Sequence, residues 1–216
     1  MLCGPLITGL QWALEFYRMS TAPAKRRWSV AEYLAREELA LTKSEFFDGE
    51  IVAMAGATIA HNIITTNVLS HLHALLRGSG CRPFVSDLRI KVDAANSFLY
   101  PDVTVICGDV VQAEEDSCSV INARVIIEVL SDSTESKDRG RKFQLYLKLD
   151  SLQEYVLISQ NQPRIEKLFR RNDGTWIMSI VEGMKDSVVF DSIECRLAMA
   201  EIYDVVKFEQ PPAETT

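Results

Sequence analysis

The stretch VIIEVLSDST, residues 125–134, decides the fold because one charged residue interrupts an otherwise apolar run. Glu128 has only valine, isoleucine and leucine around it between residues 125 and 130. A strand this apolar is typical of a sheet that is covered on both faces. A carboxylate buried there without a partner is costly, or it takes up a proton. We therefore expect Glu128 to have a buried partner, either a metal ion or a basic side chain.

A helix and a second strand follow this stretch. The cap-rich residues 131–136 lead into KDRGRKFQLYLKL, residues 137–149, whose apolar residues fall on roughly one side of a helix. The segment SLQEYVLIS, residues 151–159, then returns as a strand. Strand, helix and strand in this order predict a βαβ crossover.

The rest of the chain alternates helices and strands. Helices are predicted at residues 30–39, after a Ser29 N-cap, and within residues 61–80. Asp48-Gly49 predicts a hairpin turn. Strands at residues 88–92 and 100–106 are predicted as antiparallel neighbours.

Beyond residue 163 we expect two strands around Asp173-Gly174, a short strand and a closing helix. The fold class is therefore α/β with a mixed sheet, flanking helices and a C-terminal β-rich portion.

Length and composition favour one domain. The chain has 216 residues, of which 47% are hydrophobic, enough to bury one sizeable core. We assign residues 28–205 to this domain, residues 1–27 to an N-terminal extension that includes the alternative start Met19, and residues 206–216 to a flexible tail. The opening residues are a poor secretory signal, and no segment indicates a membrane span.

The cysteines indicate a reducing compartment. They are odd in number, widely scattered and never spaced as CxxC: Cys3, Cys81, Cys107, Cys118 and Cys195. This pattern predicts reduced thiols in the cytoplasm and argues against a structural zinc site.

The net charge of -7 disfavours one class of function, a protein that binds nucleic acid with its whole surface. It still allows a hydrolase that contacts DNA through a local basic groove. A possible phosphate-facing rim contains Arg82, Arg89, Lys91, Lys137, Arg139, Arg141, Lys142 and Lys148. The alternative is ordinary surface charge.

A second carboxylate lies at the start of a predicted strand. Asp102 follows Pro101, which cannot donate to a strand ladder and therefore favours a strand start. If this strand pairs with the strand of Glu128, the two carboxylates converge, and a divalent cation between them relieves their repulsion. Oxygen ligands of this kind suit Mg²⁺ or Mn²⁺. Asp102 could instead be a simple strand-edge residue, and Glu128 half of a buried ion pair.

Five motifs together carry a resemblance to a known family. They are EFFDGEI at residues 45–51, AGATIAHN at 55–62, YPD at 100–102, IEVLS at 127–131 and DRGRKFQLY at 138–146. This combination resembles the Uma-two family of putative restriction endonucleases, part of the PD-(D/E)XK nuclease superfamily. The resemblance covers about residues 28–205.

The resemblance implies a restriction-endonuclease-like core in which Asp102 and Glu128 bind Mg²⁺ or Mn²⁺ for phosphodiester hydrolysis. The superfamily's usual lysine would stand two residues after the glutamate, where this chain has Leu130. The resemblance points instead to Lys142 on the following helix, and to Glu45 as a further site residue. Lys142 could instead pair with Asp138, four residues earlier, on a solvated face, and Glu45 could be an exposed hairpin residue.

Three functions follow from these residues. The first is a metal-dependent endonuclease of DNA that acts as a homodimer. The second is a catalytically silent interaction or scaffold protein with the same fold, and the third is a nuclease of RNA or branched DNA.

Among the histidines, His61 could approach the site, although a hydrogen bond at the helix start is the favoured role. His71 and His73 do not share a helix face.

Overall fold

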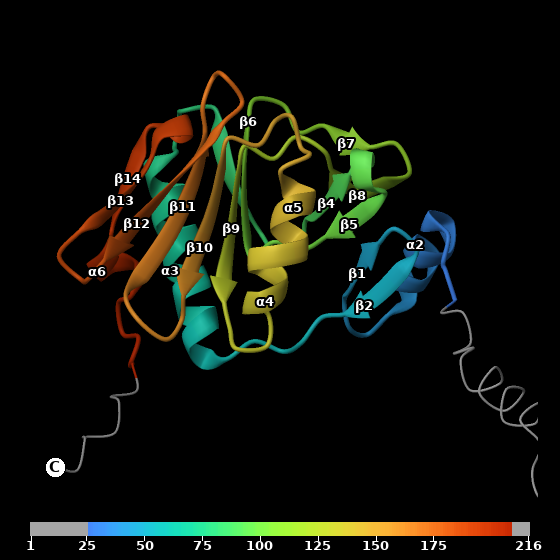
Figure 1. The fold of residues 1–216 in the computed structure, drawn as a ribbon, viewed down its shortest axis with the longest axis horizontal. Coiled ribbons are helices and arrows are strands. Elements are labelled where there is room, and N and C mark those ends of the chain that lie inside the picture. Colours follow the sequence, from blue (N-terminus) through green and yellow to red (C-terminus); the bar gives the residue numbers. More distant parts are fainter. Residues whose placement is uncertain (1–25, 209–216) are drawn as a thin grey trace, which may run out of the picture.

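The computed structural model describes residues 26–208, which form two large sheets with helices against them (Figure 1). One sheet has the strand order β2-β1-β5-β4-β8-β7 and the other β12-β11-β10-β9-β6-β3. The first contains β1 (Ser44–Phe47), β2 (Glu50–Ala53), β4 (Arg89–Val92), β5 (Ser97–Leu99), β7 (Gln112–Ala113) and β8 (Asp116–Val120). The second contains β3 (Cys81–Val85), β6 (Val103–Cys107), β9 (Val125–Leu130), β10 (Glu154–Ser159), β11 (Arg164–Arg170) and β12 (Trp176–Glu182).

Helices and a small hairpin complete the described chain. The helical elements are α2 (Val30–Leu39), α3 (Ile59–Leu75), η1 (Asp93–Ala95), α4 (Glu135–Lys137), η2 (Asp138–Lys142), α5 (Phe143–Tyr146), η3 (Asp191–Ile193) and α6 (Met199–Ile202). The hairpin pairs β13 (Ser187–Phe190) with β14 (Cys195–Ala198). None of the helices at residues 26–208 has the length and apolar character needed to cross a membrane.

The long apolar strand β9 lies inside its sheet, as its composition predicts. It pairs with β10 in parallel and with β6 antiparallel, and all six of its residues are buried. Its two faces belong to different cores. Ile127 and Val129 pack with α3, β13, β14 and α6, whereas Ile126 and Leu130 pack with α5 and residues of the first sheet. The predicted βαβ crossover from β9 to β10 is therefore confirmed.

Local signals in the sequence agree with the structure at several points. Ser29 caps α2, and its hydroxyl accepts a hydrogen bond from the Glu32 N–H. Asp48 and Gly49 join β1 to β2 with φ of 44° and 93°, the left-handed geometry that an Asp-Gly hairpin turn requires. The C-terminal β-rich portion is also present, as β11 to β14.

The predicted pairing of strands 88–92 and 100–106 is wrong. The antiparallel neighbour of β4 is β5, whereas β6 lies between β9 and β3 in the other sheet. The chain passes between the two strands β5 and β6 at Tyr100–Asp102, where Pro101 has no N–H to donate to a neighbouring strand and so ends β5. Asp102 consequently stands where the chain passes from one sheet to the other.

The prediction of reduced thiols is also wrong for two cysteines. Cys81 of β3 and Cys107 of β6 are directly opposite each other in the antiparallel ladder, and they form a disulfide. A separation of 26 residues hides this pairing in the sequence, since only the strand register brings the two together. Cys118 and Cys195 are free.

The predicted extension at residues 1–27 and tail at residues 206–216 lie largely outside the described residues. Those two predictions, and the assignment of residues 28–205 to one domain, therefore stay predictions.

Candidate active site

The two predicted metal-binding carboxylates lie side by side at one end of the second sheet. Val103 of β6 is opposite Ile127 of β9, so the antiparallel register places Asp102 next to Glu128. The Asp102 carboxylate is held in place by the strand it faces, because its Oδ2 accepts a hydrogen bond from the Val129 N–H at 2.7 Å. The convergence expected from the sequence is confirmed.

Glu45 reaches the same place from the other sheet. It lies in β1 and is buried, so the alternative of an exposed hairpin residue is wrong. Its Oε1 accepts a hydrogen bond from the Tyr100 N–H at 3.4 Å, next to the break where the chain changes sheets. Both sheets therefore contribute a carboxylate to the site.

Lys142 lies at the centre of the carboxylates. Its Nζ is 2.6 Å from Glu128 Oε1, 3.2 Å from Glu45 Oε1 and 3.3 Å from Asp138 Oδ1. The side chain of Lys142 is only 6% exposed. Lys142 does pair with Asp138, but in a buried pocket and not on a solvated face.

Asp138 is a site residue that the sequence analysis did not select. It opens η2, a π-helical turn that ends at Lys142, and it is buried. Such turns are often found at functional sites. The signal in the sequence was the i, i+4 spacing of an acid and a base in the helical segment that follows a buried strand.

Two tyrosines hold this helix against the sheet. The Tyr146 hydroxyl donates to Glu128 Oε1 at 3.1 Å, and the Tyr155 hydroxyl donates to the Asp138 carbonyl oxygen at 3.0 Å. Both rings are fully buried and contact each other. The positions of Lys142 and Asp138 over the sheet are therefore fixed by packing as well as by charge.

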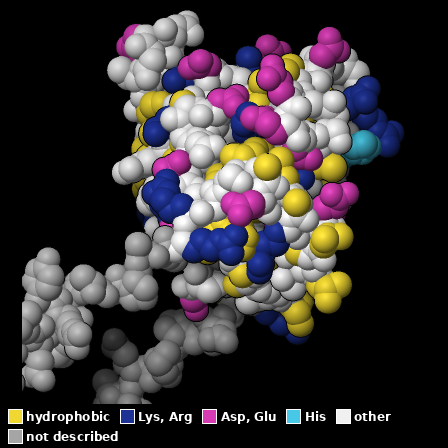
Figure 2. Space-filling view, turned by 90° about the vertical axis from the view of Figure 1, so that its right-hand side faces the viewer, with side chains coloured by type: hydrophobic (Ala, Val, Ile, Leu, Met, Phe, Trp, Pro, Cys, Tyr) yellow, Lys and Arg dark blue, Asp and Glu magenta, His cyan; other side chains and the backbone are white. Residues whose placement is uncertain are grey.

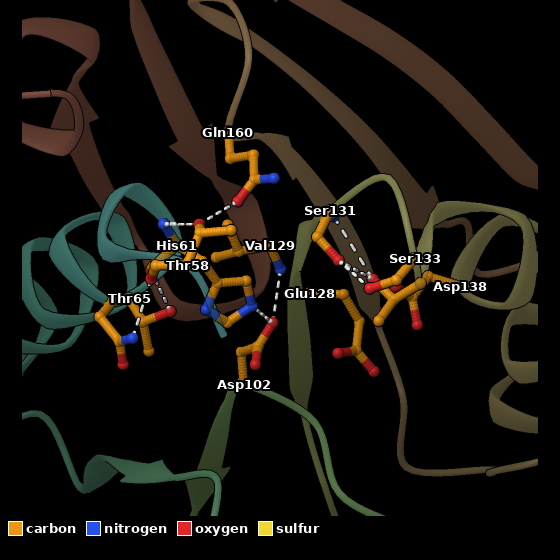
Figure 3. A network of polar contacts seen from close by, with 12 residues as sticks. Thr58, His61, Thr65, Asp102, Glu128, Val129, Ser131, Ser133, Asp138 and Gln160 are labelled. Atoms are coloured by element: carbon orange, nitrogen blue, oxygen red, sulfur yellow. Dashed lines mark hydrogen bonds and ion pairs between the residues drawn. The ribbon is translucent and has the colours of Figure 1, made fainter. Parts of the chain in front are cut away.

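His61 contributes to the site from the start of α3. Its backbone N–H donates to Thr58 Oγ1 at 3.1 Å, which is the expected hydrogen bond at the helix start. Its ring does more, because Nε2 lies 3.1 Å from Asp102 Oδ2 (Figure 3). The opposite ring nitrogen, Nδ1, is buried and has no hydrogen-bond partner. The sequence could not reveal this contact, which joins residues 41 positions apart.

The burial of so many ionisable groups shifts their pKa values. Burial raises the pKa of Glu128 well above its ordinary value, although the Lys142 ammonium opposes the shift. Burial would lower the pKa of Lys142, but the surrounding carboxylates, Glu128 first, raise it well above its ordinary value. Burial also raises the pKa of Asp138. Glu128, Asp138 and Lys142 therefore bind their protons more tightly than exposed side chains of the same types do.

The pKa of His61 follows the same logic. Burial alone would lower it, but the hydrogen bond to Asp102 and the charge of that carboxylate raise it overall.

These residues line a cavity of about 420 Å³ that opens between the two sheets. This is the size of a typical ligand site. Glu45, His61, Asp102, Glu128, Asp138 and Lys142 all line it. At its edge, in the turn between β9 and α4, the Ser131 hydroxyl hydrogen-bonds with the hydroxyls of Ser133 and Thr134. The cavity therefore combines a charged floor with hydroxyl groups that could contact a polar ligand.

The donor chemistry of this cavity suits a hard divalent cation. Oxygens of Glu45, Glu128 and Asp138 already converge on one positive charge, the Lys142 ammonium, and Asp102 adds a further carboxylate. Carboxylate oxygens are the ligands that Mg²⁺ and Mn²⁺ prefer. As the side chains stand, residues 26–208 contain no group of three or more His, Cys, Asp or Glu placed to hold a metal ion. An incoming ion would therefore compete with Lys142.

The predicted basic rim is largely neutralised. Carboxylates pair with Arg89, Lys91, Arg139, Arg141 and Lys142. Lys137 and Lys142 are the rim residues that line the cavity. On the face that carries β1, β2 and α2, acidic and basic side chains are interspersed and form no continuous basic surface (Figure 2).

Comparison with known proteins identifies the family. The profile of the Uma2 family, described as "Putative restriction endonuclease", matches residues 30–200. The chain belongs to the Uma2 family. Two relatives come from Synechocystis sp.. The uncharacterized protein sll1609 is 37% identical over 162 residues, covering 75% of this chain and 92% of that protein. The uncharacterized protein slr1290 is 33% identical over 180 residues, covering 83% and 93%.

A solved structure shows the same fold. The crystal structure of a "putative nuclease belonging to DUF820" from Anabaena variabilis matches with a TM-score of 0.68 at 16% identity. The match covers 82% of this chain and 97% of that one. The predicted nuclease-like α/β fold is thus confirmed, and membership of Uma2 supports a nuclease function.

Within this Uma2 protein, the absence of a lysine at position 130 has a structural explanation. Leu130 is buried in the core formed with α5, on the same face of β9 as Glu128. The positive charge beside Glu128 is instead the ammonium group of Lys142, on the helical segment that covers the sheet.

Proposed function

We propose that this protein is a metal-dependent endonuclease that hydrolyses phosphodiester bonds of DNA. The observation that carries the proposal is the buried lysine between carboxylates at the floor of a cavity, in a chain of the Uma2 family. Asp102 and Glu128 would hold Mg²⁺ or Mn²⁺, with Glu45 and Asp138 as nearby carboxylates. When bound, the ion supplies Lewis acidity at the phosphate and activates a water molecule for attack.

The protein's own residues have distinct roles in this proposal. Lys142 orients the scissile phosphate and offsets the negative charge that develops on it, because it is buried among groups that keep it protonated. His61 and the Val129 N–H hold one oxygen of Asp102 and so fix the orientation of the carboxylate. Thr58, at the N-cap of α3, accepts from the His61 backbone and donates to Gln160, which anchors the helix start at the site.

Purified protein tests the proposal with plasmid and oligonucleotide DNA in Mg²⁺ or Mn²⁺. We expect cleavage that is lost in Asp102→Asn and Glu128→Gln and kept in the control Glu114→Gln, an exposed residue of the β7–β8 turn. Isothermal titration provides a second readout, with Mg²⁺ binding weakened in Asp102→Asn. Cleavage that is unchanged in both site variants would refute the proposal.

A second candidate is a catalytically silent interaction or scaffold protein. One observation favours it: Lys142 already satisfies the buried carboxylates without a metal ion. A folded protein that binds no Mg²⁺ at millimolar concentration would support this candidate and count against the nuclease. The remaining alternative is a nuclease of RNA or branched DNA. Cleavage assays with duplex DNA, RNA and branched DNA distinguish it from a nuclease of duplex DNA.

We propose further that the protein acts as a homodimer, since cleavage of both strands of a duplex needs two sites. A cytoplasmic location stays a prediction. The Cys81–Cys107 disulfide removes the argument from reduced thiols that led to it.

A further inference from the structure

Strand β12 is an edge strand of the second sheet. Within residues 26–208 its one strand neighbour is β11, to which it pairs along its full length from Trp176 to Glu182. The opposite side of β12 therefore presents backbone N–H and C=O groups that no strand of the described chain uses. Such an edge is a template for pairing with another strand.

The side chains of β12 are unusual for an open edge. Proteins commonly protect such edges with charged residues or proline. Here the five central residues, 177–181, are IMSIV and contain neither. Ile177 is 38% exposed, Met178 52% and Ile180 48%. An exposed apolar edge of this kind indicates that another strand covers it.

The sequence of β12 is self-complementary. If a second copy pairs antiparallel around Ser179, each Met178 lies opposite an Ile180 and each Ile177 opposite a Val181. Residues directly opposite each other point to the same face of the sheet, so apolar side chains meet apolar side chains on both faces.

The ends of the strand lie opposite each other in this register. Antiparallel pairing brings Glu182 of one copy to Trp176 of the other. The ring of Trp176 lies beside the Arg170 guanidinium of its own chain, 5.5 Å from the ring centroid. Glu182 is already ion-paired with Arg164 of its own chain, so the strand ends add no charge attraction, and the apolar pairs at residues 177–181 carry the pairing.

We infer that a second copy of this chain pairs with it through β12, antiparallel and centred on Ser179. The two second sheets become one continuous sheet of twelve strands. This inference does not depend on nuclease activity, and it assigns a face to the homodimer proposed above.

Paired charge variants test the inference in the full-length chain. One variant carries Met178→Lys with Ile180→Lys, and the other carries Met178→Glu with Ile180→Glu. In the proposed register each places like charges directly opposite each other, so each alone is expected to be monomeric. Mixed in equal amounts, every introduced lysine faces an introduced glutamate, and a dimer should return.

Light scattering after size-exclusion chromatography reads the outcome. The unmodified chain is expected to have a mass of twice 24.3 kDa, as a dimer. Each variant alone is expected to have the mass of one chain, and the mixture of the two variants is expected to have the mass of a dimer again. The control Val85→Lys changes an exposed apolar residue on β3, the other edge of the same sheet, and should remain dimeric. Circular dichroism confirms that the variants are folded. A monomeric unmodified chain, dimeric separate variants, or folded variants that fail to combine would each overturn the inference.

Discussion

Replacement of Lys142 by methionine is expected to lower the stability of the fold, because it removes the positive charge beside the buried carboxylates. The Lys142 Nζ lies within 3.3 Å of oxygens of Glu45, Glu128 and Asp138. Removing one partner of a buried ion pair costs about 3–5 kcal/mol. Because the carboxylates can take up protons, we expect the lower end, about 3 kcal/mol of unfolding free energy at pH 8. For a chain of this length that lowers Tm by roughly 6–12 °C.

The loss should depend on pH. Burial raises the pKa values of Glu128 and Asp138, so the folded state binds protons more tightly than the unfolded state. Stability then falls as pH rises from their ordinary values toward the raised ones. Without Lys142 both carboxylates lose the charge that opposes this shift, and the penalty grows. The difference between Lys142→Met and the unmodified chain should therefore shrink as pH is lowered from 8 to 5.

A divalent cation should restore part of the lost stability. Mg²⁺ or Mn²⁺ competes with the Lys142 ammonium for the same oxygens, so the variant should gain more in Tm from millimolar metal than the unmodified chain does. Thermal unfolding followed by circular dichroism measures both effects. The control Lys43→Met, which removes an exposed ion pair with Asp87, should cost at most about 1 kcal/mol. An equal loss in both variants, or no additional gain from metal in Lys142→Met, would refute this reasoning.

Three further predictions concern other parts of the chain. His61→Ala removes one of the two contacts that hold the Asp102 carboxylate and should lower Mg²⁺ affinity and cleavage rate by about 10–100-fold, measured by titration and kinetics; unchanged values would count against a role for the histidine. A hydrogen bond from Arg139 lowers the pKa of Glu166, so this stabilisation is present above the ordinary pKa and lost as pH falls through the lowered one; Glu166→Gln should flatten that part of the acid unfolding curve, and an unaltered curve would contradict it. Ser29→Ala removes the cap of α2 and should cost about 1 kcal/mol in urea unfolding; a cost near zero would show that the cap is dispensable.

The sequence could predict the elements whose causes are local. Ser29 before a periodic apolar run marks a helix start, and Asp48-Gly49 marks a turn that few other residue pairs allow. Glu128 within an apolar strand signals a buried partner from its immediate neighbours alone. These features need no knowledge of distant contacts, and the structure agrees with each.

Features that depend on distant pairing escaped the sequence. Strand β6 belongs to a different sheet from β5, and only the register of β3 against β6 brings Cys81 to Cys107. The contact of His61 with Asp102 joins the start of a helix to a strand end 41 positions later. Asp138 was visible as a possible partner of Lys142, but its burial depends on how the helix packs on β9 and β10. Residue patterns carry little information about such arrangements.

The central claim is that Asp102 and Glu128 bind a divalent metal ion beside Lys142. The most direct test is a crystal of the full chain soaked in Mn²⁺, with anomalous diffraction to locate the ion. We predict a peak in the cavity in contact with both carboxylates, which disappears in Asp102→Asn crystals soaked in the same way. A cavity without a peak at millimolar Mn²⁺, with Lys142 still bound to Glu128, would contradict the account.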